Sequence, residues 1–94
     1  MGRLLRENWG KGGTFATIRL ESGDIVMISM SAVDVKVLKM KFGHVPVGTV
    51  WKRPIPDDVD RHAILDWLRD QVLKCGTVEE IAGKLDRVSA RWPT

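Results

Sequence analysis

The residue best suited to acid–base chemistry in this chain is His44, which lies in the glycine- and proline-containing segment GHVPVG. An imidazole titrates near neutral pH and can therefore give or take a proton in a reaction. The segment from Gly43 to Gly48 is accordingly a candidate site for a small molecule or an enzymatic reaction, with His44 as the residue that contacts the ligand. A single histidine in a loop is more often a surface residue, so two other hypotheses stand ahead of this one.

A second cluster combines three aspartates with the other histidine of the chain, in the segment PDDVDRH. Carboxylate oxygens bind hard cations such as calcium. However, Asp57, Asp58 and Asp60 stand where a helix is expected to begin, and there carboxylates cap free amides and complement the helix dipole. Their spacing, together with His62, matches no calcium-binding loop. We therefore expect a structural role for this cluster and no metal site.

No nucleophile is accompanied by residues that would activate it. Cys75 belongs to an apolar helical stripe, where a thiol is buried and inert, and no serine lies in a GxSxG motif. The segment WGKGGT contains a Gly-Lys pair, but a phosphate-binding loop needs GxxxxGK[ST] between a strand and a helix. The sequence therefore favours a protein without catalytic residues and without a cofactor, although a site assembled from distant residues stays open.

Basic residues accompanied by tryptophan give the clearest binding signal. The segment VDVKVLKMKF carries a row of lysines, and the segment TVWKR places two cations after a tryptophan. The candidate residues are Lys36, Lys39, Lys41, Trp51, Lys52 and Arg53. A sheet face with cations and aromatic rings can bind single-stranded nucleic acid through phosphate contacts and base stacking. The alternative is a solvated lysine-rich face, which also discourages aggregation between sheet edges.

The charge of the chain is unevenly distributed. Its 15 lysines and arginines and 12 aspartates and glutamates give a net charge of +3. Residues 1–53 carry a surplus of positive charge, and residues 54–94 carry a surplus of negative charge. Such asymmetry can mark an anionic partner for the basic part. The simpler interpretation, for so small a charge, is that the two parts attract each other.

Three segments alternate apolar and polar residues as strands do. TFATIRL and DIVMISMS are separated by the turn ESGD and predict a hairpin. VDVKVLKMKF predicts a third strand, and a bulge near Val37–Leu38 would return Leu38, Met40 and Phe42 to the buried face. The three lysines of this segment would then share the opposite, solvated face. TVWKR predicts a short fourth strand after a loop, and the two prolines of PIPDD end it.

The rest of the chain shows helical periodicity. From about Asp58 to Cys75 one stripe carries Ile64, Leu65, Leu68 and Val72, with Trp67 at its edge. A second helix begins after Thr77, which together with Glu80 has the spacing of a capping box. Its stripe comprises Val78, Ile81, Leu85, Val88 and Trp92. The run TVEEIAGKL is similar to the first helix of helix-turn-helix motifs, but this is a common amphipathic pattern, and we interpret the segment as a packing helix.

These elements predict an α+β fold with three to four antiparallel strands, the third bulged, and two C-terminal helices packed on one face of the sheet. We expect a single domain over residues 1–94, with a flexible arm over 1–13, a β part over 14–53 and a helical part over 57–92. One cysteine excludes an intrachain disulfide, and no apolar run is long enough for a transmembrane helix or a signal peptide. We therefore expect a cytoplasmic protein that does not bind membranes.

The leading functional hypothesis is a non-catalytic interaction or regulatory protein that binds a protein partner or associates with itself. It depends on the absence of catalytic motifs and on a hydrophobic fraction of 44% with four tryptophans, which leaves apolar surface for a partner to cover. The alternatives are nucleic-acid binding through the basic residues named above, and a small-molecule or enzymatic site at His44.

Overall fold

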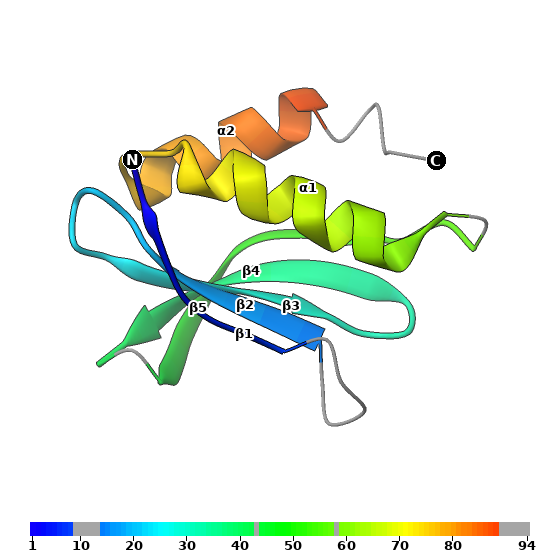
Figure 1. Cartoon of the computed structure of the whole chain (residues 1–94), viewed down its shortest axis with the longest axis horizontal. Coiled ribbons are helices and arrows are strands. Elements are labelled where there is room, and N and C mark those ends of the chain that lie inside the picture. Colours follow the sequence, from blue (N-terminus) through cyan, green and yellow to red (C-terminus); the bar gives the residue numbers. More distant parts are fainter. Residues whose placement is uncertain (9–13, 43, 58, 89–94) are drawn as a thin grey trace.

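The structure is a computed structural model that describes residues 1–8, 14–42, 44–57 and 59–88, and for Val88 it describes the backbone alone. Within these residues a layer of five antiparallel strands is packed against a layer of two helices (Figure 1). The strands are β1 (Arg3–Asn8), β2 (Thr14–Arg19), β3 (Ile25–Met30), β4 (Asp34–Lys41) and β5 (Val45–Pro54), and the helices are α1 (Arg61–Leu73) and α2 (Val78–Val88). The predicted α+β class, with a sheet followed by two helices, is confirmed.

The described sheet has one strand more than the three to four that the sequence predicted. Each strand pairs with the next one along the chain, so the spatial order is β1-β2-β3-β4-β5. The additional strand is β1, which lies within the segment expected to be a flexible arm. It pairs with β2 from Arg3, opposite Arg19, to Asn8, opposite Phe15. The rest of that expected arm, residues 9–13, lies outside the described residues.

The last strand also begins earlier than expected. β5 includes Val45 to Gly48, which the sequence assigned to a loop because of its glycine and proline. A proline cannot donate a hydrogen bond to a neighbouring strand, and β5 tolerates Pro46 because it lies at the edge of the sheet. The loop between β4 and β5 is therefore short.

A bulge is present at the predicted point, but the extra residue belongs to the neighbouring strand. The pairing of β4 with β5 shifts between Val37 and Leu38, where Val50 of β5 has no opposite residue. The pairing of β3 with β4 is unbroken over the same stretch. The side chains of β4 therefore keep alternating, and Leu38 and Met40 face away from the side to which Val37 projects.

The same alternation corrects the expectation that three lysines share one face. Lys36 lies opposite Ser29 and projects to the same side of the sheet as Leu38. Lys39 lies opposite Val26, whose side chain is fully buried beneath the helices. Lys39 and Lys41 thus project to the helix-bearing side, at a point where both are exposed.

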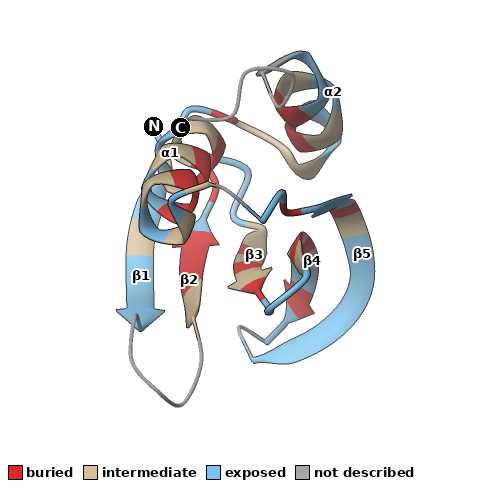
Figure 2. Ribbon diagram, turned by 90° about the vertical axis from the view of Figure 1, so that its right-hand side faces the viewer, coloured by how far each residue is buried: buried red, intermediate tan, exposed pale blue. Residues whose placement is uncertain are grey.

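The hydrophobic core lies between the sheet and the two helices (Figure 2). The predicted stripe of α1 is confirmed and fully buried, and Cys75 lies beside it. The sheet contributes Ile18, Val26, Ile28, Met30, Val35, Val37 and Trp51, and α2 contributes Ile81 and Leu85. The Val88 side chain and Trp92, which the sequence placed on the same stripe, lie outside the described part of the chain.

The Asp60 side chain caps α1, and Thr77 and Glu80, which the sequence paired, are in contact at the start of α2. The Asp60 carboxylate accepts the backbone N–H groups of His62 and Ala63, so α1 begins at Arg61. Before α2, the Thr77 hydroxyl donates to the Glu80 carboxylate, which also accepts the N–H of Gly76. The contacts of Asp60 satisfy amides that would otherwise lack partners at the first turn of α1.

Candidate functional site

Trp51 is a core residue, although the sequence made it a candidate for base stacking. Its side chain is only 4% exposed, and its indole N–H donates to the Asp86 carboxylate at 2.9 Å. The Arg53 guanidinium lies 5.3 Å from the Trp51 ring and forms an ion pair with the same carboxylate of α2. Trp51 and Arg53 therefore hold α2 against β5.

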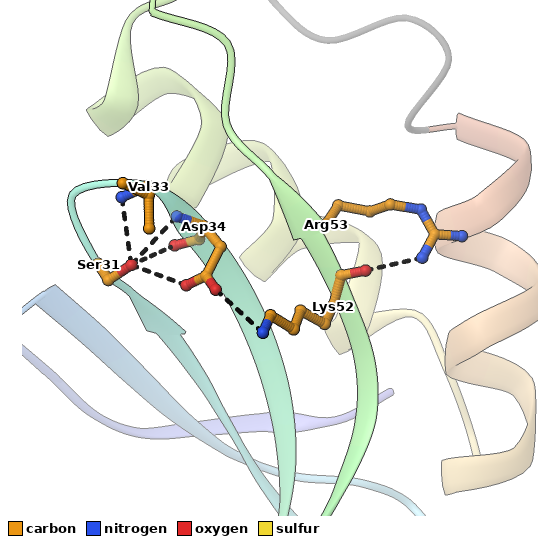
Figure 3. A network of polar contacts seen from close by, with 5 residues as sticks. All are labelled: Ser31, Val33, Asp34, Lys52 and Arg53. Carbon is orange, nitrogen blue, oxygen red and sulfur yellow. Dashed lines mark hydrogen bonds and ion pairs between the residues drawn. The ribbon is translucent and has the colours of Figure 1, made fainter.

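Lys52 projects to the opposite side of β5 and takes part in a small polar network (Figure 3). Its ammonium nitrogen lies 3.4 Å from the Asp34 carboxylate. The Ser31 hydroxyl donates to the same carboxylate at 2.7 Å and accepts the backbone N–H of Asp34 at 3.1 Å. The hydrogen bond from Ser31, together with the charges of Lys52 and Lys36, holds the pKa of Asp34 below its ordinary value.

The helix-free side of the sheet brings together side chains from all five described strands. Both described helices lie on one side of the sheet (Figure 2), so the other side carries no helix in the described part of the chain. Residues directly opposite each other in antiparallel strands project to the same side. The strand pairings therefore define three rows on this side. The rows are Asn8, Phe15, Ser29, Lys36 and Lys52; Arg6, Thr17, Met27, Leu38 and Thr49; and Arg3, Arg19, Ile25, Met40 and Pro46.

We call these three rows, together with Asp34, the open face. Its centre, on β3 and β4, is apolar: Ile25, Met27, Leu38 and Met40 lie side by side there. Each of these four side chains is half-buried or buried, so they cover one another and do not project. The centre is therefore a continuous apolar surface.

Cations frame this apolar centre. The open face carries Arg3, Arg6, Arg19, Lys36 and Lys52, against the single carboxylate of Asp34. The positive charge of Lys52 is balanced by its ion pair with the Asp34 carboxylate. Among the described residues no carboxylate lies within ion-pair distance of the other four cations. The open face therefore has a clear positive potential.

One aromatic ring belongs to the open face. Phe15 is half-buried on β2, and the Arg6 guanidinium of β1 lies 5.4 Å from the centre of its ring. A guanidinium over an aromatic ring forms a cation–π contact. This pair presents two flat groups at the edge of the apolar centre.

A second exposed apolar cluster lies at the β4–β5 hairpin. Phe42 is 80% exposed, and Val45 and Val47 are 42% and 52% exposed. Phe42 has a φ of 55°, in the left-handed region that bulky residues rarely adopt. Lys41 lies 5.2 Å from its ring. We call Phe42, Val45 and Val47 the hairpin cluster.

His44 lies in this hairpin and is exposed. Its Nδ1 atom lies 2.8 Å from the carbonyl oxygen of Phe42, to which it donates in the tautomer that carries the hydrogen on Nδ1. Gly43, the first residue of the predicted ligand site, lies outside the described residues. The structure brings His44 close to Lys41 and the hairpin cluster.

For one member of the acidic cluster, Asp60, the structure shows the capping role that the sequence indicated. Asp60 caps α1, as described above, and Asp58 lies outside the described residues. Within the described residues no group of three or more histidine, cysteine or acidic side chains has the geometry of a metal site. Cys75 is buried, its thiol donates to the Gln71 carbonyl at 3.5 Å, and burial raises its pKa.

A shallow hollow lies along α2, and none of the candidate site residues lines it. It is lined by Glu79, Glu80, Gly83, Lys84 and Arg87. These residues belong to one helix and mix both signs of charge, so the hollow offers no defined ligand chemistry.

Sequence reasoning missed most of the open face. Of its cations, it singled out Lys36 and Lys52 but not Arg3, Arg6 or Arg19. The signal that reveals them is the register of β1 against β2, which aligns these arginines with the rest of the sheet.

Comparisons of the chain with protein families, with curated proteins and with solved structures found no match in any of the three. Within the part of the chain that the structure describes, neither helix is long and apolar enough to cross a membrane. The functional argument therefore depends on the surfaces described above.

Proposed function

We propose that the chain is a non-catalytic interaction protein that binds a macromolecular partner through the open face. The composition of that face carries the proposal. A sheet face that meets only water typically has polar residues at its central positions. Here Ile25, Met27, Leu38 and Met40 occupy the centre of a face that no described helix covers. A partner that covered them would remove apolar surface from water.

The size of the open face indicates what kind of binding it supports. Five strands and three rows define a patch on the order of 500 Å², given the spacing of strands and of alternate residues. A standard stable interface buries about 800 Å² on each partner. Apolar contact through this face alone is thus modest, and charge must contribute to the affinity.

The apolar centre can be tested with the paired substitutions Met27→Gln and Leu38→Gln, which lie opposite each other on β3 and β4. Val33→Gln is the matched control, because Val33 is an exposed apolar residue outside the open face. The immobilised proteins are incubated with cell extract, and bound proteins and nucleic acids are both analysed. We expect at least one macromolecule that the wild type and the control retain and that the paired variant loses. Identical bound material on all three proteins, each folded by circular dichroism, would contradict the proposal.

Self-association is the second candidate, and a specific observation favours a different surface for it. Two open faces placed against each other would bring ten cations together, which repel. The edge strands are also poorly suited to pairing, since β1 and β5 both contain register breaks and β5 contains prolines. The hairpin cluster, by contrast, exposes three apolar side chains in a short segment.

Analytical ultracentrifugation over a wide range of protein concentration tests this second candidate. We expect the wild type to associate reversibly, and we expect Phe42→Ser together with Val47→Ser to remain monomeric. The open-face pair Met27→Gln and Leu38→Gln should associate as the wild type does. A wild type that is monomeric at every concentration would exclude self-association.

A further inference from the structure

We propose that the partner of the open face is single-stranded nucleic acid, whose phosphates meet the face's cations and whose bases lie on Phe15 and the adjoining apolar side chains. This inference rests on the proposed function of the same face. The binding residues differ from those that the sequence indicated. Trp51 and Arg53 contact α2, so the arginines of β1 and β2 are the proposed phosphate-binding residues.

The first argument is charge complementarity. Four cations of the open face, Arg3, Arg6, Arg19 and Lys36, form no ion pair within the described residues. The five strands together carry eight lysines and arginines and two acidic residues, whereas α1 and α2 carry four and five. The uneven charge of the sequence thus becomes a basic sheet layer beneath a nearly neutral helical layer. A polyanion would be drawn to the sheet.

The second argument concerns the chemistry between the cations. A single strand presents flat bases as well as phosphates, and bases stack on aromatic rings and guanidinium planes. Phe15 with Arg6 over its ring supplies both groups on neighbouring strands. Met27 and Leu38 extend the apolar surface from that pair across the sheet. A phosphate-only ligand would leave this surface without a function.

The shape of the open face favours a single strand over the other polyanions. Recognition of duplex DNA commonly uses an element that enters a groove, and both described helices lie on the other side of the sheet. Insertion into an anionic lipid surface needs apolar side chains that project. Those at the centre of the open face are half-buried or buried. Unpaired bases need neither an inserted element nor projecting side chains, because they stack on the side chains of the face itself.

The test follows the fluorescence anisotropy of a labelled mixed-sequence single-stranded oligonucleotide as protein is added at several salt concentrations. With four phosphate contacts, the logarithm of the association constant plotted against the logarithm of the salt concentration should have a slope of about −3. The duplex of the same sequence, and vesicles of phosphatidylserine and phosphatidylcholine, are measured in parallel. We expect the single strand to bind more tightly than the duplex, and the vesicles not to bind.

Paired variants assign the binding to the open face. Arg6→Gln with Arg19→Gln should reduce the slope to about −1.5, since two phosphate contacts are lost. Lys84→Gln with Arg87→Gln removes the same charge from α2 and should leave the slope unchanged. Phe15→Leu should weaken binding about tenfold at constant slope, because it removes the ring and keeps an apolar side chain.

Each contrary result has a definite meaning. The inference is overturned if the wild type does not bind the single strand at low salt, if vesicles bind in its place, or if both charge pairs weaken binding equally. In any of these cases the extract experiment still tests the proposed function. If a protein from the extract binds the wild type but not the variant Met27→Gln with Leu38→Gln, the proposed function stands with a protein partner. If that variant also retains everything that the wild type binds, both proposals fail.

Discussion

Asp86 joins the second helix to the sheet through two side chains of β5. Its carboxylate accepts the indole N–H of Trp51 and pairs with Arg53. This hydrogen bond is partly buried and its acceptor is charged, so loss of the carboxylate removes a stabilising contact between α2 and β5. This single carboxylate thus links α2 to two side chains of β5.

We therefore expect Asp86→Ala to lower the free energy of unfolding by about 1 to 2 kcal/mol. Urea denaturation followed by tryptophan emission measures the change. Asp70→Ala is the control, because Asp70 forms only an exposed ion pair with Arg69, and such pairs contribute less than about 1 kcal/mol. Equal effects of the two substitutions would contradict the role assigned to Asp86.

The Asp34 carboxylate should make stability depend on pH. Its pKa is lower in the folded protein than its ordinary value, chiefly because the Ser31 hydroxyl donates to the ionised form. The stabilisation is therefore present above the ordinary pKa, near pH 4, and is lost as the pH falls through the folded value. Asp34→Asn removes this dependence.

Urea denaturation at a series of pH values provides the measurement. Between neutral pH and pH 4 the wild type should be more stable than Asp34→Asn, and below the folded pKa the two proteins should converge. Ser31→Ala should reduce the same acid-dependent loss. A constant difference between wild type and Asp34→Asn at all pH values would show that the pKa of Asp34 is not lowered on folding.

The β4–β5 hairpin holds a bulky residue in an unfavourable backbone conformation. An L-residue in the left-handed region loses about 1 to 2 kcal/mol, and asparagine tolerates it better than phenylalanine does. Phe42 is highly exposed, so its replacement sacrifices little packing beyond the contact with Lys41. A residue whose backbone conformation lowers the stability of the folded protein is a candidate for a functional role.

We expect Phe42→Asn to raise the free energy of unfolding by about 0.5 kcal/mol or more. Thermal and urea denaturation measure it, with His44→Asn as a control at the neighbouring turn position. If the hairpin cluster mediates self-association, the same variant should be more stable as a monomer and associate less. A destabilised Phe42→Asn would mean that the ring makes contacts that outweigh the backbone strain.

The strands show which parts of the fold the sequence could predict. β2, β3 and β4 alternate apolar and polar residues and pack against other elements on both edges, so local pattern and tertiary contact agree. β1 has one half-buried side chain, Leu4, and no buried one, so its pattern is that of a solvated segment. Its strand conformation depends on pairing with β2, the next strand along the chain, and the apolar pattern of residues 3–8 does not reveal that pairing. The predicted fourth strand was shorter than β5, because Pro46 and Gly48 indicated a loop. A strand at the edge of a sheet tolerates both residues.

The candidate site was less predictable, for two physical reasons. The side of the sheet to which a side chain projects depends on strand register. The extra residue of the bulge lies on β5 and not on β4, so Lys36 and Lys39 project to opposite sides of the sheet. Burial of an amphipathic side chain depends on its partner, and the acceptor for the Trp51 indole is Asp86, 35 positions away. Local composition left open whether Trp51 lies on the surface or in the core, and its packing in the core together with the hydrogen bond to Asp86 decides for the core.

The central strands should be locally more stable than β1 and α2. The central strands β2, β3 and β4 are paired on both edges, whereas β1 has one neighbour. Among the described side chains of α2, those of Ile81 and Leu85 are fully buried. Free energies of local opening follow such differences in burial and hydrogen bonding. We expect amide hydrogen exchange to be slowest in β2 to β4 and fastest in β1 and α2. Asp86→Ala should accelerate exchange in α2 without changing β2, and uniform protection throughout would contradict this order.

The meander connectivity has a consequence for synthesis on the ribosome. Because each strand pairs with its predecessor, every hairpin can close as soon as its second strand emerges, and only short loops need to be closed. The apolar side that α1 and α2 will cover is then complete before either helix has been made. The nascent chain therefore displays Ile18, Val26 and Ile28 until residues 61–73 arrive, and in that interval it is a natural substrate for chaperones.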